Sequence, residues 1–171
     1  MTISKFIGFA VAGLLEAALL AGCGYRPLYG SSPENPGVAA QLSSVVIREA
    51  TTRTGQIIRN DLISSLQPGN GGAPERYTLS LTPEVRSTAV IDKPQPVTTR
   101  ESLNLTVSYE LTDQKTGNVV HQGKTFSQVS YDVVRQPFAD KQAEADATAR
   151  AAHEVSADIR TRLAAYFASH Q

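Results

Sequence analysis

The chain has 171 residues with 16 basic and 16 acidic side chains, so its formal net charge is zero. That balance argues against a nucleic-acid-binding protein, for which an excess of lysine and arginine is expected. The one cysteine, Cys23, excludes an intrachain disulfide, because a disulfide needs two cysteines.

Residues 1–22 have the composition of a secretory signal peptide. Lys5 and the terminal amine give a short positive region, and residues 6–20 form an apolar stretch followed by small side chains. This stretch is shorter than a membrane span of about 20 apolar residues, and the carboxylate of Glu16 interrupts it at a cost in free energy. We therefore expect residues 1–22 to be removed on export.

The residues up to the cysteine indicate lipid attachment. Leu20, Ala21, Gly22 and Cys23 resemble the bacterial lipobox, in which the cysteine sulfur receives a diacylglyceryl group before cleavage and acylation of the new amine. Each buried methylene contributes about 0.8 kcal/mol, so several acyl chains make a stable anchor. Gly24, in place of an aspartate, favours the outer membrane by the same resemblance. The alternative is a cytosolic protein with an apolar N-terminal helix and a buried free cysteine.

A tether, a strand and a helix are predicted next. Residues 23–40 are rich in proline and glycine, which favours an extended tether. A β-branched run predicts a strand over 42–47. A helix is predicted from Thr52 or Thr54 to Pro68, because apolar residues recur at every fourth position. These residues are Ile58, Leu62 and Leu66.

The second strand is predicted from an alternation of apolar and polar residues over 77–82, and it continues toward residue 91. Pro83 is expected at a bulge or at an edge of the sheet, since proline cannot donate to a strand ladder. A proline-rich loop is predicted over 92–96.

The third strand has the clearest alternation, over 102–111, which predicts one buried face and one solvated face. A turn over 113–118 leads to a fourth strand over 119–131, whose alternation is poor. Gly123 is interpreted as a bulge at which the faces of this strand exchange.

The last element is predicted to be a helix from Pro137 or Asp140 to about Ala168. No glycine or further proline interrupts it, and small or apolar residues recur at every fourth position. These residues are Ala143, Ala147, Ala151, Val155, Ile159, Leu163 and Phe167.

The element order β-α-β-β-β-α predicts an α+β fold. The last three strands form an antiparallel meander, and the first helix crosses over between strands one and two. Each helix has one apolar stripe and the meander has one apolar face. The economical arrangement is a two-layer α/β sandwich with two helices on one face of a four-stranded mixed sheet. Residues 41–171 are expected to form this single domain.

The sequence offers no site for a metal, a cofactor or catalysis. His121, His153 and His170 lack the spacing of metal ligands and are interpreted as solvated side chains. Asp140 and Glu144 lie near the start of the last helix, where the helix dipole favours acids without any catalytic role. An enzyme is therefore not expected.

Cations on the predicted strands and their loops are the candidate binding residues. They are Arg86, Lys93, Arg100 and Lys124. Arg100 has the same parity as Ser102 and Asn104, which lie on the polar face of the third strand. Cations on an open polar face can hold phosphate groups by charge-assisted hydrogen bonds. The alternative is an ordinary solvated surface.

Several short motifs, in order along the chain, resemble the lipopolysaccharide-assembly lipoprotein family, LptE, in its alphaproteobacterial form. The most specific is the octapeptide Cys-Gly-Tyr-Arg-Pro-Leu-Tyr-Gly over 23–30. The others are Arg53-Thr54-Gly55-Gln56 with Arg59-Asn60, Thr99-Arg100, Ser130-Tyr131-Asp132, Phe138-Ala139 and Asp146-Ala147.

This resemblance implies a non-enzymatic outer-membrane lipoprotein. Such a protein sits as a plug in a large LptD-like translocon barrel, helps that barrel fold, and binds lipopolysaccharide during its transfer to the cell surface. The four cations above are then the candidate lipopolysaccharide-binding residues, from sheet position and charge alone. The alternative function is that of an auxiliary lipoprotein in a periplasmic lipid-transport system.

Overall fold

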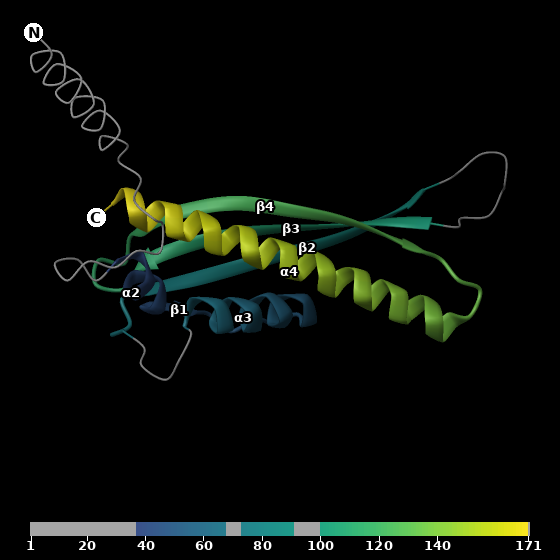
Figure 1. Ribbon diagram of the computed structural model, residues 1–171, viewed down its shortest axis with the longest axis horizontal. Helices are drawn as coiled ribbons and strands as arrows, with labels where there is room; N and C mark the ends of the chain where they lie inside the picture. The colour runs from purple at the N-terminus through teal and green to yellow at the C-terminus, as the bar shows by residue number, and fades with distance from the viewer. Residues whose placement is uncertain (1–36, 68–72, 91–99, 171) are drawn as a thin grey trace, which may run out of the picture.

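Figure 1 shows the protein as a computed structural model, in which residues 37–67, 73–90 and 100–170 are described. The predicted signal peptide, Cys23, most of the predicted tether, Lys93 and the predicted loop 92–96 lie outside these residues. In chain order the elements are α2 (Gly37–Ser43), β1 (Val45–Ile47), α3 (Arg53–Leu66), β2 (Tyr77–Val90), β3 (Arg100–Asp113), β4 (Val119–Asp132) and α4 (Pro137–Ser169).

The strands form one mixed sheet in the order β1-β2-β3-β4. β1 is parallel to β2, and β2, β3 and β4 form an antiparallel meander. The helix α3 makes the crossover between the two parallel strands, and α3 and α4 lie together on one side of the sheet (Figure 1). The predicted α+β, two-layer arrangement is confirmed.

Helix α2 was not predicted and replaces the end of the tether and the start of the first strand. Val38 and Leu42 lie four residues apart on one side of this helix, and both are buried. This spacing suits one helical face against the core. Strand β1 is therefore shorter than predicted and begins only at Val45.

Helix α3 begins where the sequence placed it. The Thr52 hydroxyl accepts a hydrogen bond from the Gly55 N–H at 3.1 Å, which satisfies one of the free donors of the first turn. The predicted stripe of Ile58, Leu62 and Leu66 is buried. Of the two predicted N-cap candidates, Thr52 and Thr54, Thr52 is therefore the N-cap.

Pro83 lies at a sheet edge and not in a bulge. The register between β2 and β3 continues through Pro83 without a shift. Tyr77 donates its N–H to the Ser44 carbonyl, so odd-numbered residues of β2 point their backbone groups toward β1. Since β1 ends opposite Leu79, the missing N–H of Pro83 removes no hydrogen bond from the ladder.

The interpretation of Gly123 as a bulge is wrong. The register between β3 and β4 shifts at the start of β4, where Val119 pairs with Thr112 and His121 pairs with Leu111, so that Val120 is the extra residue. Gly123 pairs in regular register with Tyr109. A Cβ atom on Gly123 would lie 2.5 Å from the Tyr109 hydroxyl oxygen, so glycine makes room for the tyrosine ring.

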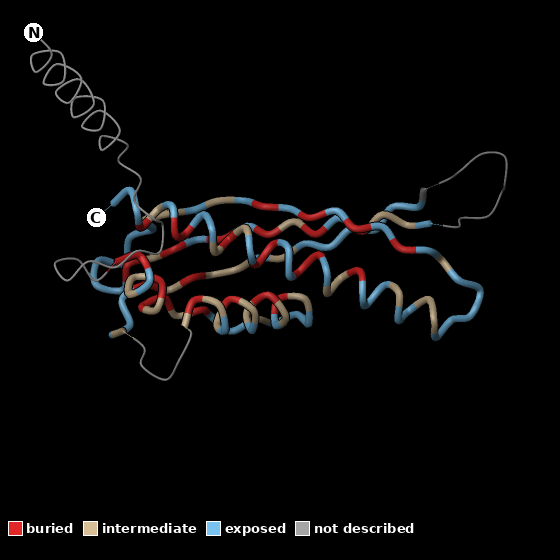
Figure 2. The backbone as a smooth tube through the Cα atoms, in the orientation of Figure 1, coloured by how far each residue is buried: buried red, intermediate tan, exposed pale blue. Residues whose placement is uncertain are grey.

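Helix α4 runs the length of the sheet, and its predicted stripe is buried from Ala147 onward. Ala147, Ala151 and Ala152 are fully covered, which lets the helix approach its neighbours closely. Residues 137–146 include no buried side chain. Figure 2 shows this contrast along the helix, with buried residues where α4 lies near the strands and mostly exposed residues at its start.

Candidate functional site

The sheet has one open face, made of the even-numbered residues of β2, β3 and most of β4. On β3 the odd-numbered residues from Leu103 to Asp113 are buried, whereas the even-numbered residues are exposed or half-buried. No described helix covers this open face (Figure 1). Its uncharged polar members include Thr78, Ser80, Thr82, Ser102, Asn104, Thr106, Ser108, Gln128 and Ser130. The face is therefore a broad surface of hydroxyl and amide groups.

Three predicted binding cations lie on this open face. Arg86, Arg100 and Lys124 have the exposed parity of β2, β3 and β4 respectively. The fourth, Lys93, lies outside the described residues. The expected common face is thus observed for the three cations that the structure describes.

These cations are spread along the sheet. Arg86 pairs with Asn104, which in turn pairs with Gln128, and this row lies four residues from both Arg100 and Lys124. At about 3.3 Å per residue, the rows of Arg100 and Lys124 are about 26 Å apart. One phosphate group cannot bridge them, so they act as separate contact points.

Two of the three cations already have acidic partners. Arg86 forms an ion pair with Glu84, with 2.5 Å between Nη2 and Oε1, and Arg100 pairs with Asp132 at 3.1 Å. Ion pairs this exposed contribute little to stability, and a ligand can compete for the arginines. Within the described chain, Lys124 has no ion pair.

Phe126 is the side chain of this face that the sequence analysis missed. It follows Lys124 on the open side of β4, opposite Thr106, and is 70% exposed. A single exposed ring is common on protein surfaces, but Phe126 lies two residues from Lys124 on the same face, so one partner could contact both side chains. The signal in the sequence was the poor alternation of β4, where an aromatic side chain occupies a polar position.

The inner face of β4 explains the rest of that poor alternation. Thr125 and Ser127 are buried there, and their hydroxyls donate to Asp158 and Glu154 of α4, each at 2.5 Å. Burial favours the neutral form of Asp158, but the hydrogen bonds from Thr125 and Arg162 outweigh it and lower the pKa. These contacts join the two layers and do not form a ligand site.

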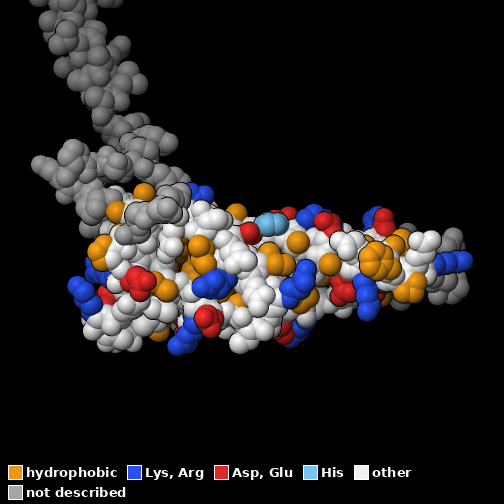
Figure 3. Space-filling view, turned by 90° about the horizontal axis from the view of Figure 1, so that it is seen from below, with side chains coloured by type: hydrophobic (Ala, Val, Ile, Leu, Met, Phe, Trp, Pro, Cys, Tyr) orange, Lys and Arg blue, Asp and Glu red, His pale blue; other side chains and the backbone are white. Residues whose placement is uncertain are grey.

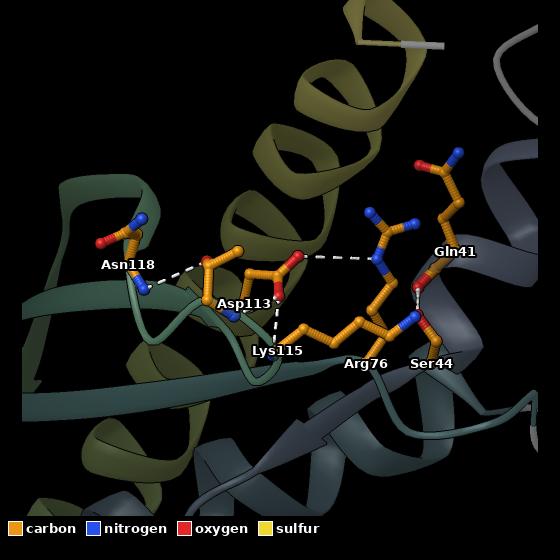
Figure 4. Close-up of polar contacts among 7 residues, drawn as sticks. Gln41, Ser44, Arg76, Asp113, Lys115 and Asn118 are labelled. Atoms are coloured by element: carbon orange, nitrogen blue, oxygen red, sulfur yellow. Dashed lines mark hydrogen bonds and ion pairs between the residues drawn. The ribbon is translucent and has the colours of Figure 1, made fainter.

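Asp113, the last residue of β3, has a buried carboxylate, and its partners also indicate a structural role. Asp113 accepts hydrogen bonds from the backbone N–H groups of Lys115 and Thr116 at 2.8 and 3.2 Å, and Arg76 lies 3.6 Å away (Figure 4). These contacts, led by the Lys115 N–H, lower the pKa of Asp113. Gly117 completes the turn with a φ of 71°.

Nearby, Ser44, the residue before β1, is held by its neighbours. The Ser44 hydroxyl donates to the Gln41 carbonyl at 2.7 Å, and the Ser44 carbonyl accepts from Arg76 and Tyr77 (Figure 4). All of these groups have protein partners. Asp113 and its surroundings are therefore a clamp between α2, β2 and the β3–β4 turn.

The histidines do not come together as metal ligands. His153 hydrogen-bonds to Asp61 across α3 and α4, with 2.5 Å between Nδ1 and Oδ2. His121 stacks on Tyr166, with 4.8 Å between ring centroids, and is half-buried, so it is only partly solvated. Within the described residues, no group of three or more His, Cys, Asp or Glu side chains is placed to hold a metal.

Two pairs of the short motifs meet in space. Arg100 and Asp132, from separate motifs, are cross-strand neighbours as well as ion partners. Arg53 and Asp146 both line a hollow of about 620 Å³ between α3 and α4.

On the face seen in Figure 3, basic and acidic side chains are interspersed, with no large area of one sign. Among the described residues, no helix has both the length and the apolar composition of a membrane span.

Comparisons with known proteins identify relatives. Residues 28–163 match the family LptE, described as lipopolysaccharide-assembly. A crystal structure of a candidate lipoprotein from Caulobacter crescentus CB15 is 32% identical, with a TM-score of 0.65, over 77% of this chain and 96% of that one. No match is found among curated proteins.

More distant solved structures share the fold. A minor lipoprotein from Acinetobacter baumannii is 17% identical, with a TM-score of 0.52, over 71% of this chain and 88% of its own. Rare lipoprotein B from Shewanella oneidensis is 12% identical, with a TM-score of 0.56, over 73% of this chain and 95% of its own. The sandwich is thus common to lipoproteins with little sequence identity.

Proposed function

Because this chain belongs to the LptE family of lipopolysaccharide-assembly proteins, we propose that it is an outer-membrane lipoprotein that plugs the lipopolysaccharide translocon barrel. In this role it helps the LptD-like barrel protein to assemble and assists the insertion of lipopolysaccharide at the cell surface. It acts by contact and not by catalysis.

The observation that carries the proposal is the family match over residues 28–163, which include the whole sheet and most of α4. The open face of the sheet is consistent with it. A barrel lumen is polar, and the hydroxyl and amide groups of this face can hydrogen-bond to such a wall. A chain with no net charge is not strongly repelled by a lumen that is lined by both positive and negative side chains.

Attachment to the membrane follows from Cys23 in this proposal. Acyl chains on the thiol and on the new amine hold the protein at the periplasmic side of the outer membrane. A short tether keeps the folded domain near the barrel and raises its effective concentration there.

Lipopolysaccharide contact is assigned to the cations of the open face. Arg86, Arg100 and Lys124 can donate to phosphate groups, and Lys93 is assigned the same role from its charge. Since Arg100 and Lys124 lie about 26 Å apart along the sheet, we expect them to contact different parts of a large ligand or different ligand molecules.

Affinity purification tests the proposal directly. The full-length protein with a C-terminal tag is purified from detergent-solubilised outer membranes, and we expect a large β-barrel protein to copurify with it. Depletion of the protein is expected to reduce the amount of that barrel in the membrane. Recovery without any barrel protein would overturn the proposal.

Crosslinking in living cells separates the two candidate functions. A photoreactive residue is placed along the open face at Asn104 or Thr106, between the rows of Arg100 and Lys124. Adducts with an outer-membrane barrel support the plug. Adducts with a periplasmic or inner-membrane transporter, together with unchanged surface lipopolysaccharide, would support an auxiliary transport lipoprotein instead.

A further inference from the structure

A hollow lined by aromatic rings lies where the last turns of α4 meet the start of β4. It has a volume of about 410 Å³, and its walls include Tyr109, His121, Tyr166, His170, Arg162 and Ser169. None of the candidate cations of the open face belongs to it, and its aromatic rings and Arg162 lie on the helix side of the sheet. It is thus a second surface, separate from the open face.

The floor of the hollow depends on the two irregular features of β4. The extra residue Val120 sets the register in which His121 faces Leu111 on the inner side of the sheet. Gly123 has no side chain, so the Tyr109 ring lies across it and brings its hydroxyl to 3.4 Å from His121 Nε2. Both features serve to place these two rings.

The wall of the hollow is a run of contacting rings. His121 stacks on Tyr166 with 4.8 Å between centroids and an angle of 22° between the planes. The ring centroid of Tyr166 in turn lies 4.4 Å from that of His170. Such ring faces offer apolar surface, while the ring nitrogens, the tyrosine hydroxyls and the hydroxyl of Ser169 offer hydrogen bonds.

The hollow has a cation but no acid in its lining. Arg162 is held from behind by Asp158, with 2.7 Å between Nε and Oδ2, and Asp158 is itself fixed by Thr125. The larger hollow between α3 and α4 is lined by two acids, Glu144 and Asp146, and by two cations, Arg53 and Lys141. The aromatic hollow, whose lining has a cation and no acid, is therefore the better suited of the two to a negatively charged ligand.

We propose that the aromatic hollow binds a phosphorylated sugar unit. The apolar C–H face of a pyranose ring packs against Tyr166 and His170, its hydroxyls exchange hydrogen bonds with the surrounding polar groups, and Arg162 donates to the phosphate. This inference rests on the proposed function, in which lipopolysaccharide supplies such units, and it adds a subsite outside the open face.

The test uses the full-length protein in detergent micelles, with lipopolysaccharide that has been freed of all acyl chains as the probe. Imidazole NMR signals report the binding, and the chain supplies its own control. The signals of His121 and His170 are expected to shift, while that of His153, which lies at the α3–α4 contact, stays in place. Shifts in all of the histidines equally, or in none, would overturn the inference.

Variants identify the contacts. Arg162→Gln is expected to weaken binding by about tenfold, because a charged hydrogen bond to phosphate is lost. Arg150→Gln is the matched control, since Arg150 is a similarly exposed arginine of α4 that also pairs with an acid four residues earlier. His170→Ala, at an exposed position beyond the helix end, tests the ring wall without a change in the core. Equal affinities for Arg162→Gln and Arg150→Gln would refute the role of the hollow.

Further arms separate the ligand chemistries and the two proposals. The dephosphorylated oligosaccharide is expected to bind about tenfold more weakly, and inorganic phosphate alone should leave His170 unshifted. If inorganic phosphate reproduces the shifts, the site binds anions in general and the sugar assignment is wrong. Binding of intact lipopolysaccharide that is unaffected by Arg162→Gln and His170→Ala would refute only the hollow. A wild-type protein that binds no intact lipopolysaccharide would contradict the proposed function itself.

Discussion

Tyr109 and Gly123 face each other across β3 and β4, and the tyrosine ring occupies the space that any side chain at position 123 would need. An added Cβ would lie 2.5 Å from the hydroxyl oxygen and 2.7 Å from Cζ of Tyr109. Atoms of this kind do not approach so closely, so the ring or the strand has to move.

Gly123→Ala is therefore expected to lower the free energy of unfolding by about 1–3 kcal/mol, the usual cost of overpacking a well-filled site. Urea denaturation measures the change. The same substitution in a Tyr109→Leu background is expected to cost less, because the clashing ring is gone. Equal costs in both backgrounds would show that the ring is not the obstacle.

The turn carboxylate makes stability depend on pH. The pKa of Asp113 is lowered from 3.8, first by the Lys115 N–H and also by Thr116 and Arg76. A lowered pKa in the folded state stabilises the protein above the unfolded value, and this contribution is lost as pH falls through the folded value. The difference in unfolding free energy between wild type and Asp113→Asn is therefore expected to shrink below about pH 4. Glu110→Gln, on the exposed face of β3, is the control. If the difference between wild type and Asp113→Asn stays constant with pH, this linkage is refuted.

The hydroxyl of Thr125 links the layers through Asp158. Thr125→Val keeps the shape of the side chain but loses the hydrogen bond, so we expect a loss of about 1 kcal/mol in unfolding free energy. The pKa of Asp158 is expected to rise, since one of the two groups that lower it is removed. Thr82→Val, at an exposed position on the open face, should change stability much less. Similar losses for the two variants would mean that this hydrogen bond has no special weight.

The cations of the open face are tested by charge reversal. Arg100→Glu with Lys124→Glu is expected to weaken lipopolysaccharide binding without a change in the circular dichroism spectrum. Of the two single variants, Lys124→Glu should weaken binding more than Arg100→Glu, because Arg100 is already neutralised in part by Asp132. Lys141→Glu, an exposed charge reversal on α4, is the control. Unchanged affinity in the double variant would remove the open face from the list of lipopolysaccharide contacts.

Cys23 is the expected anchor, and its replacement tests attachment. Cys23→Ala is expected to move the protein from the membrane fraction to the soluble fraction, because no acyl chain can be attached. Fractionation with immunoblotting measures the distribution. Mass spectrometry of the wild-type protein should find an acylated cysteine as the first residue, and an uncleaved, unmodified start would contradict lipid attachment.

Elements with local signals in the amino-acid order could be predicted before the structure was known. The four-residue spacing from Ala147 to Phe167 and the alternation from Leu103 to Leu111 each describe one buried face, and both faces are buried in the structure. A helix or strand with one apolar side has only one way to turn that side inward. From these elements the two-layer α+β sandwich followed, as did the place of Arg100 on the polar face of β3. That Lys124 shares this face was decided by the regular register of β4 through Gly123.

Features that depend on partners far apart in the chain could not be predicted in this way and became known from the folded arrangement. Thr125 is buried because Asp158 meets it from α4, and Gly123 is required because Tyr109 crosses it from β3. Likewise, the aromatic hollow forms only when β4 and the end of α4 come together. No periodicity along the chain encodes such contacts, since each depends on where a second element packs and not on the residues beside it.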